Sequence, residues 1–257
     1  MRRIRDIIAI VLLHAGADAR NGCLPRISNV LRLSLLSAVP LLLPLAANAQ
    51  QVDSQLWLQT NGTVTIGDRE KVTLEGIGRF SDRAEGFSHA ELGALFTHTL
   101  EGGIELSIGY RHVEDWNRGV ALPNEERLRQ MVLVPFGSGF SGRLRLEERF
   151  NSSGGGVGVR VRPRLGFDTP LNDKGLKLFA TQEHFLNLNT TGWGQQGGYE
   201  RMRNAAGLSF GLGGKLRGEV GYLNQYRFGR GGRRDQMDHA ATSTLSFNVA
   251  SFGASGD

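Results

Sequence analysis

Cysteine and long hydrophobic runs are nearly absent from this sequence. Cys23 is the only cysteine among 257 residues, and it lies in an N-terminal segment that we predict to be cleaved off. The rest of the chain therefore has no disulfide and no thiolate for catalysis or metal binding. After residue 49 no apolar stretch approaches the roughly 18 residues that identify a membrane-spanning helix. These absences exclude a disulfide-framed domain and a helical membrane protein.

The first 49 residues have the features of a secretory presequence. Three arginines within the first five residues precede an apolar run over residues 33–45, and the small residues Ala47-Asn48-Ala49 follow it. A basic start, an apolar core and a small-residue cleavage site are the three parts of such a signal. We therefore predict a presequence over residues 1–49 and a mature protein over residues 50–257. A retained N-terminal anchor is the alternative.

The positive charge of the chain is concentrated in this presequence. The whole chain has 30 Lys and Arg residues and 25 Asp and Glu residues. Residues 1–49 contain six of the basic and two of the acidic residues, so the mature chain has 24 basic and 23 acidic residues. Binding to nucleic acid depends on a clustered excess of positive charge. We therefore expect no nucleic-acid partner for the mature chain.

Apolar and polar residues alternate through most of the mature chain. In residues 157–168, valines and other apolar residues occupy one face and arginines the other, which is the period of a β-strand. Most of the alternating segments are about 10–12 residues long, close to the roughly 9–11 that a tilted membrane strand needs. The eleven segments are Leu56–Ile66, Val72–Phe80, Phe87–His98, Ile104–Glu114, Glu126–Phe136, Phe140–Phe150, Val157–Asp168, Leu176–Leu188, Tyr199–Leu212, Leu216–Phe228 and Asp238–Val249.

The connections between these segments alternate between tight and long. The tight ones are glycine-rich and span 67–70, 99–103, 137–139 and 213–215, and the longer ones span 81–86, 115–124, 151–156, 189–198 and 229–237. Short turns at one end and long loops at the other are typical of outer-membrane barrels. Because bacterial single-chain barrels have even numbers of strands, we expect one segment to be spurious or another to be hidden, which gives ten or twelve strands.

Aromatic residues gather at the ends of the predicted strands. The outward positions hold Phe80, Tyr110, Phe150, Tyr226 and Phe228 at the long-loop end and Phe136, Phe140, Phe167, Phe210 and Phe247 at the turn end. Two such belts are expected at the two lipid–water boundaries. A soluble β-sandwich or jelly roll is the alternative. Its strands also alternate apolar and polar residues, but its packing does not require aromatic residues to gather at strand ends. We therefore predict an all-β fold, an antiparallel transmembrane β-barrel, in the outer membrane of a Gram-negative-type bacterium.

The faces predicted to point inward are unusually charged. Arginine far outnumbers lysine in the mature chain, and its planar guanidinium suits multiple hydrogen bonds to carboxylates. Long side chains can largely fill a barrel of this size. We therefore interpret the inward charges as an ion-pair network that fills the lumen, with a small pore or ligand site for anions as the alternative. The network comprises Arg143, Arg145, Glu147, Arg149, Arg160, Arg162, Arg164, Glu183, Arg201, Arg203 and Glu219.

Two patterns that suggest enzymatic chemistry lack the context it requires. The G-x-G-x-x-G pattern over residues 137–142 would need a helix to begin there for a dinucleotide site, whereas the alternation predicts a hairpin turn. Asp238, His239 and Ser243 contain the groups of a hydrolase, but those groups must converge in space. We assign no catalytic, cofactor-binding or metal-binding residue and expect no enzyme. A lipid-modifying or proteolytic enzyme of the outer membrane is the alternative.

A basic, glycine-rich loop follows the tenth segment. It contains Arg230, Arg233 and Arg234. Clustered arginines favour phosphate groups, so this loop is either a solvated surface loop or a contact with outer-membrane lipopolysaccharide.

Three short motifs occur in order in the C-terminal half. They are Glu-His-Phe-Leu-Asn at 183–187, Glu-Arg-Met-Arg-Asn at 200–204 followed by Gly207, and Gly-Tyr-Leu-Asn-Gln at 221–225. This series resembles the domain-of-unknown-function family numbered 2490, a group of predicted outer-membrane β-barrel proteins, over the mature chain from Trp57 to His239. The resemblance implies the barrel fold and its location. It carries no assigned activity, so it transfers no site residue.

Overall fold

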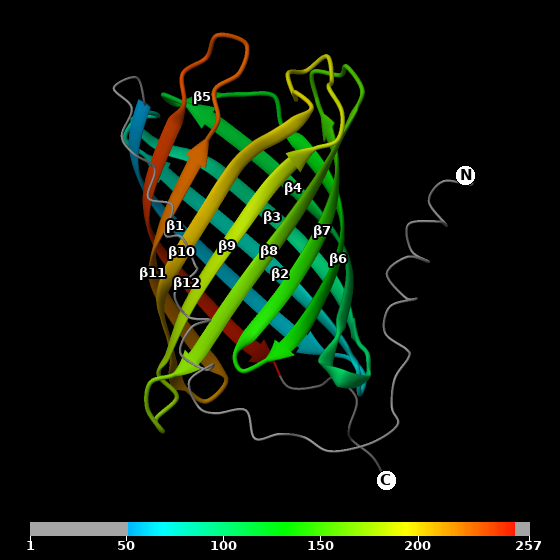
Figure 1. Ribbon diagram of the computed structural model, residues 1–257, viewed down its shortest axis with the longest axis vertical. Coiled ribbons are helices and arrows are strands. Elements are labelled where there is room, and N and C mark those ends of the chain that lie inside the picture. The colour runs from blue at the N-terminus through cyan, green and yellow to red at the C-terminus, as the bar shows by residue number, and fades with distance from the viewer. Residues whose placement is uncertain (1–50, 250–257) are drawn as a thin grey trace, which may run out of the picture. The chain divides into compact units, whose positions relative to one another are not determined.

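The computed structural model describes residues 51–249, which form a β-barrel (Figure 1). The predicted presequence and residues 250–257 lie outside the described part. The strands are β1 Gln51–Thr65, β2 Glu70–Ser81, β3 Gly86–Thr99, β4 Glu105–Asn117, β5 Val120–Ala121, β6 Glu125–Gly137, β7 Phe140–Asn151, β8 Val157–Pro170, β9 Lys177–Asn187, β10 Gly198–Gly213, β11 Leu216–Arg227 and β12 Gln236–Val249, with a 3₁₀ turn, η1, at Glu101–Gly103.

Eleven of the described strands form a closed wall. Each wall strand pairs antiparallel with the next along the chain, and the two-residue β5 pairs only with the end of β4. The wall closes where β1 lies parallel to β12, from Gln51 opposite Gln236 to Val64 opposite Val249. The predicted all-β barrel is confirmed, and all eleven predicted segments are wall strands. The expected count of ten or twelve is wrong.

The parallel seam between β1 and β12 follows from the odd number of wall strands. Strand direction reverses at every hairpin, so the first and eleventh wall strands run the same way. The expectation of an even number assumed that the closing pair must be antiparallel. A parallel ladder also pairs the backbone N–H and C=O groups of both strands, and a closed wall has no unpaired edge.

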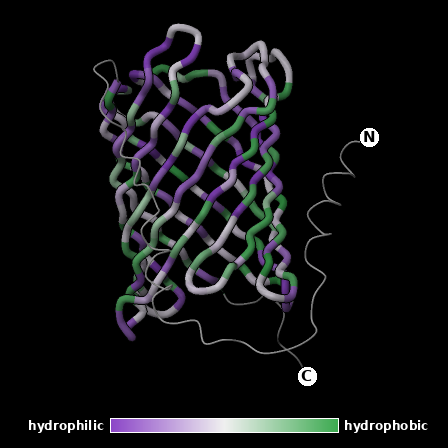
Figure 2. Tube along the Cα trace, in the orientation of Figure 1, coloured by the Kyte–Doolittle hydropathy of each residue, from purple (hydrophilic) through white to green (hydrophobic). Residues whose placement is uncertain are grey.

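Each wall strand divides its side chains between the lumen and the outer surface. In β8, Arg160 and Arg162 are 3% and 7% exposed, whereas Val157 and Leu165 on the other face are 41% and 49% exposed. Hydrophilic and hydrophobic residues alternate along the wall in Figure 2. Water-soluble domains bury apolar side chains and rarely bury arginine. This barrel has the opposite arrangement.

Exposed aromatic rings lie towards both ends of the outer surface. Phe80 and Phe87 pack edge to face near the long-loop end, with ring centroids 5.3 Å apart. Phe140 and Phe167 pack near the tight-turn end at 4.8 Å. The exposed rings near the two ends are Phe80, Phe87, Phe150 and Phe228, and Phe96, Phe136, Phe140 and Phe247. Tyr110, predicted for the long-loop belt, and Tyr222 are exposed rings near the middle of their strands.

The glycine-rich segment at residues 137–142 is a hairpin turn between β6 and β7. Gly137, Ser138 and Gly139 all have positive φ, at 82°, 50° and 83°. Glycine adopts this left-handed region without steric cost, which explains two of the three glycines. No helix begins there, so the turn prediction is confirmed and the geometry of a dinucleotide site is absent from this segment.

The seam gives a direct test of the eleven-strand closure. Leu58 lies opposite Ser243 across the β1–β12 pair. Strand neighbours about 5 Å apart are within the Cα separation of a disulfide. We expect Leu58→Cys with Ser243→Cys to crosslink on mild oxidation, measured as an altered migration of the denatured chain. The mismatched pair Leu58→Cys with Phe247→Cys, about 13 Å off register at 3.3 Å per residue, is the control. Crosslinking of the mismatched pair alone would refute the register.

Candidate functional site in the barrel lumen

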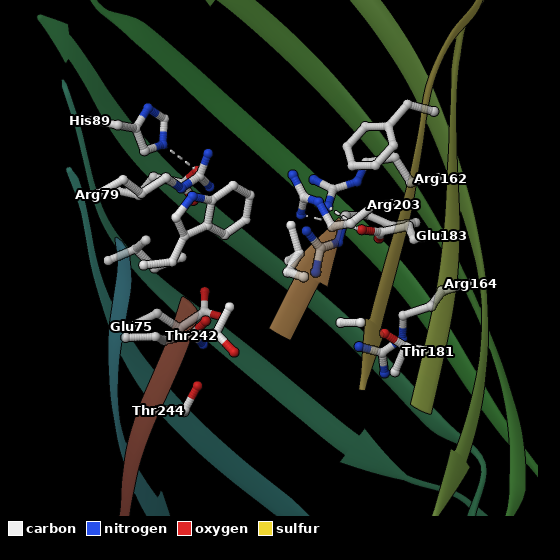
Figure 3. A pocket seen from close by; sticks show the side chains of 18 of the residues that line it. Glu75, Arg79, His89, Arg162, Arg164, Thr181, Glu183, Arg203, Thr242 and Thr244 are labelled. Carbon is white, nitrogen blue, oxygen red and sulfur yellow. Dashed lines mark hydrogen bonds and ion pairs between the residues drawn. The ribbon is translucent and has the colours of Figure 1, made fainter. Parts of the chain in front are cut away.

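The lumen contains a cavity of about 640 Å³ (Figure 3). It is lined by twelve arginines and by five carboxylates. Ten of the eleven predicted lumen residues line it; Glu147, the eleventh, is 1% exposed and contacts the lining arginines. The arginines are Arg79, Arg111, Arg127, Arg143, Arg145, Arg149, Arg160, Arg162, Arg164, Arg201, Arg203 and Arg227, and the carboxylates are Glu75, Glu91, Asp115, Glu183 and Glu219.

Glu147 of β7 is shared by three arginines. Arg160 donates to it at 2.5 Å and Arg162 at 2.7 Å, both from the neighbouring strand β8. Arg145, two residues away on the same face of β7, contacts it at 3.4 Å. Burial strengthens such charge-assisted bonds and also makes the loss of either partner costly. Glu147 therefore compensates a cationic cluster that would otherwise repel itself.

Glu183 of β9 has the same role two strands farther along the wall. Arg162 donates to it at 2.9 Å, Arg143 also donates, and Arg203 of β10 lies 3.6 Å away. Figure 3 shows Glu183 close to Arg162 and Arg203. Arg162 thus connects Glu147 to Glu183, and the two carboxylates form one continuous network.

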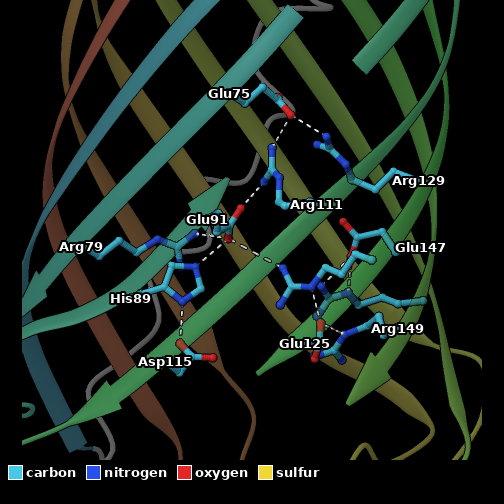
Figure 4. Close-up of polar contacts among 12 residues, drawn as sticks. Glu75, Arg79, His89, Glu91, Arg111, Asp115, Glu125, Arg129, Glu147 and Arg149 are labelled. Atoms are coloured by element: carbon cyan, nitrogen blue, oxygen red, sulfur yellow. Dashed lines mark hydrogen bonds and ion pairs between the residues drawn. The ribbon is translucent and has the colours of Figure 1, made fainter. Parts of the chain in front are cut away.

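A second group of ion pairs occupies the side of the lumen formed by β2, β3, β4 and β6 (Figure 4). Glu91 accepts a hydrogen bond from Arg79 at 3.0 Å and one from Arg111. Glu75 accepts from Arg111 at 2.8 Å and from Arg129 at 2.5 Å. The predicted set omitted Arg79, Arg111 and Arg129, although the same period of two places them, like Glu75 and Glu91, on the inward faces.

Glu125 and Glu200 are two further carboxylates that the predicted set omitted. Glu125 accepts from Arg149 at 2.6 Å. Glu200 accepts from Arg201 at 2.8 Å, although adjacent residues of a regular strand face opposite sides. A register shift between Tyr199 and Arg201 explains the exception, because a bulge turns one extra residue inward. Simple alternation could not have found Glu200.

Three aromatic residues, Trp57, Phe179 and Phe185, line the lumen, and guanidinium groups lie over two of their rings. Arg79 lies 3.9 Å from the ring centroid of Trp57, and Arg203 lies 4.7 Å from it. Phe185 is nearly inaccessible, and Arg162 lies 4.2 Å from its centroid. Such cation–π contacts partly compensate a desolvated cation. None of these inward rings was predicted, because aromatic residues were expected on the outer surface.

Arg164 and Glu219 face the cavity without an ion-pair partner in the described part of the chain. The buried Nε of Arg164 has no hydrogen-bond acceptor there. Arg164 lies opposite Glu183 in the β8–β9 register. The hydrogen bonds of Glu183, however, go to Arg143 and Arg162.

The basic loop between β11 and β12 divides its arginines between two environments. Arg230 donates to the carbonyl oxygens of Gln196 at 3.0 Å and Gly197 at 2.6 Å, which joins this loop to the β9–β10 loop. Arg233 and Arg234 are exposed.

Asp235 ends the same loop. The hydroxyl of Tyr226 and the amide of Gly229 donate hydrogen bonds to its carboxylate, and these bonds lower the pKa of Asp235 below its ordinary value. Their contribution to loop stability is present above the ordinary pKa and is lost as the pH falls through the lowered one. The loop therefore keeps its anchor at neutral pH.

The three residues that suggested a hydrolase do not converge. Asp238 is buried in the lumen and accepts a hydrogen bond from Gln225 at 2.7 Å. His239 is its neighbour on the opposite face of β12 and bonds to the hydroxyl of Tyr222. Ser243 is on the outer face, four residues beyond His239. A triad requires all three groups within hydrogen-bond reach, and this arrangement does not provide it.

No cluster of metal-binding type occurs among the described residues. Within residues 51–249 no group of three or more His, Asp or Glu side chains is arranged to hold a metal ion. In the same part of the chain, no helix is long and apolar enough to span a membrane.

The family model described as "Protein of unknown function (DUF2490)" matches residues 54–237, from β1 to the start of β12. The chain belongs to this family. The resemblance expected from the three motifs is thereby confirmed. An uncharacterized protein of Methylorubrum extorquens is 33% identical over 202 residues, which cover 76% of this chain and 88% of that protein.

The DUF2490 barrel offers a matched pair of residues for testing the network. Glu147→Gln leaves three arginines short of their shared carboxylate, so we expect it to lower stability by roughly 3–5 kcal/mol, as for other broken buried pairs. Glu148→Gln, one position along on the outer face of β7, should change stability little. Thermal unfolding of the detergent-solubilised protein, followed by circular dichroism, measures both. Equal effects of the two changes would show that Glu147 does not hold the network.

Proposed function

We propose that this DUF2490 protein is an integral β-barrel of the outer membrane of a Gram-negative-type bacterium. The closed wall with an apolar outer face and a charged interior carries the proposal, because a hydrocarbon environment accommodates only such fully paired backbones. The exposed aromatic rings near both ends and the predicted presequence support the same location.

We propose further that the Arg/Glu network fills the lumen except for the cavity of about 640 Å³ that it lines, and that the protein is not an enzyme. Glu147 and Glu183 each engage several arginines, so the charged side chains hold one another across the interior rather than standing free in water. Asp238, His239 and Ser243 lack the geometry of a hydrolase, so the alternative of a lipid-modifying or proteolytic enzyme has no supporting site.

The outer-membrane lipids are the partner that this proposal implies. Arg233 and Arg234 are exposed at the long-loop end and suit the phosphates of lipopolysaccharide. Arg230 has a different role in the proposal, since its guanidinium already holds the β9–β10 loop.

A lipid-facing substitution tests the location. Val161→Arg places a charge on the outer face within β8, and we expect it to lower stability in lipid vesicles by roughly 2–4 kcal/mol if that position lies near the bilayer centre. Ser152→Arg, in the β7–β8 loop, is the control and should be tolerated. The wild type should fractionate with outer membranes and migrate faster on gels unheated than boiled. Recovery of the wild type as a soluble periplasmic protein would refute the proposal.

A small pore for anionic solutes is the second candidate, because twelve arginines line the cavity against five carboxylates. Planar-bilayer current recordings of the wild type distinguish the filled lumen from the anion pore. A lumen filled by ion pairs should give no steady current. A steady, anion-selective current would instead establish the pore and show that the network leaves a path open.

A further inference from the structure

Arg164 is the one lining arginine that lacks a carboxylate partner in the described part of the chain. Each of the other eleven has a carboxylate oxygen within ion-pair distance. The Nε atoms of Arg164 and of the neighbouring Arg162 are also buried without an acceptor. A guanidinium withdrawn from water is costly unless an anion compensates it. The lumen therefore presents unused donors at this position.

The carboxylates near Arg164 in the described residues form no ion pair with it. Arg143 lies directly opposite it across the β7–β8 pair, and like charges in that position repel. Glu183, opposite on β9, is shared by three other arginines. Glu219 faces the same cavity but forms no ion pair within residues 51–249. Positive charge therefore exceeds negative charge around Arg164.

The charge balance of the whole cavity agrees with this local picture. Four more carboxylates, outside the five that line the cavity, contact lining arginines: Glu125, Glu147, Glu200 and Asp238. Nine carboxylates thus face twelve arginines, so positive charge remains after all pairs are formed. In a low-dielectric interior this excess attracts anions strongly.

The cavity has space and hydroxyl donors for such an anion. Its volume of about 640 Å³ falls within the roughly 300–1,000 Å³ of small-molecule sites. Thr181 lines the cavity on β9, on the same face as Glu183 and near Arg164, and Thr242 and Thr244 line it on the other side (Figure 3). Hydroxyl groups donate readily to oxyanions.

We propose that the lumen binds a small oxyanion, carrying a phosphate or carboxylate group, between Arg164, Arg143 and Thr181. The forked guanidinium groups match both oxyanions with paired hydrogen bonds. This inference rests on the proposed charged lumen and adds a binding site to it. The site requires a cavity but no continuous path through the barrel. The bound anion neutralises positive charge that the protein's own carboxylates leave uncompensated.

Isothermal titration calorimetry on the full barrel in detergent tests this site, with inorganic phosphate and succinate as separate probes. We expect saturable binding of at least one probe, weakened roughly 10- to 100-fold by Arg164→Gln, since a hydrogen bond to a charged group is worth about that much. Phosphate binding alone identifies a phosphate group, and succinate binding alone a carboxylate. Arg233→Gln, an equal change of charge in an exposed loop, should leave the affinity unchanged.

Two further measurements separate binding from folding. The bound probe should raise the melting temperature of the wild type but not of Arg164→Gln, while Arg164→Gln without a probe should be no less stable than the wild type. Glu219→Gln, which removes an unpaired negative charge from the cavity, should tighten binding. Absence of saturable binding to the wild type, or equal affinity in Arg164→Gln, would overturn the inference. Because binding is measured in detergent, this outcome is independent of whether the protein fractionates with outer membranes.

Discussion

A guanidinium or carboxylate can be buried only when opposite charge and hydrogen bonds replace the water it loses, and the interior of this barrel depends on that requirement. Strand alternation sends every second side chain into the lumen, and many of these side chains are arginine. Glu147 and Glu183 each compensate three of them, and Arg162 connects the two carboxylates. The interior therefore behaves as one electrostatic unit rather than as separate pairs.

The wall imposes a second requirement, which is that every strand must have two neighbours. Eleven strands meet it only with a parallel seam between β1 and β12. The seam brings Trp57 of β1 beside Ala240 of β12 and Leu223 of β11 in a small apolar cluster inside the lumen. The guanidinium groups of Arg79 and Arg203 lie over the Trp57 ring. The strand pair that closes the wall therefore also contributes Trp57, a contact residue of the charged interior.

Most of the fold was predictable from the sequence because the direction of a side chain along a strand is a local property. Residues 157–168 alternate so regularly that the arginines of β8 could be assigned to the lumen without any partner strand. Turn chemistry is local as well, as Gly137 and Gly139 show by their positive φ. Local alternation failed at the bulge near Glu200. At Phe185 it held, because this residue shares the inward face of β9 with Glu183. The expectation that failed there was that aromatic rings face outward.

The sequence by itself therefore determined the strands, their inward and outward faces and the abundance of arginine in the lumen. Only the tertiary structure decided that eleven strands close in parallel, and which carboxylate each arginine contacts. Those partners depend on register and on distances across the barrel, which hairpin lengths and bulges set jointly for the whole wall. Arg164 illustrates the difference. Its inward direction follows from strand alternation. It lacks an ion-pair partner because the opposite carboxylate, Glu183, is engaged by three other arginines.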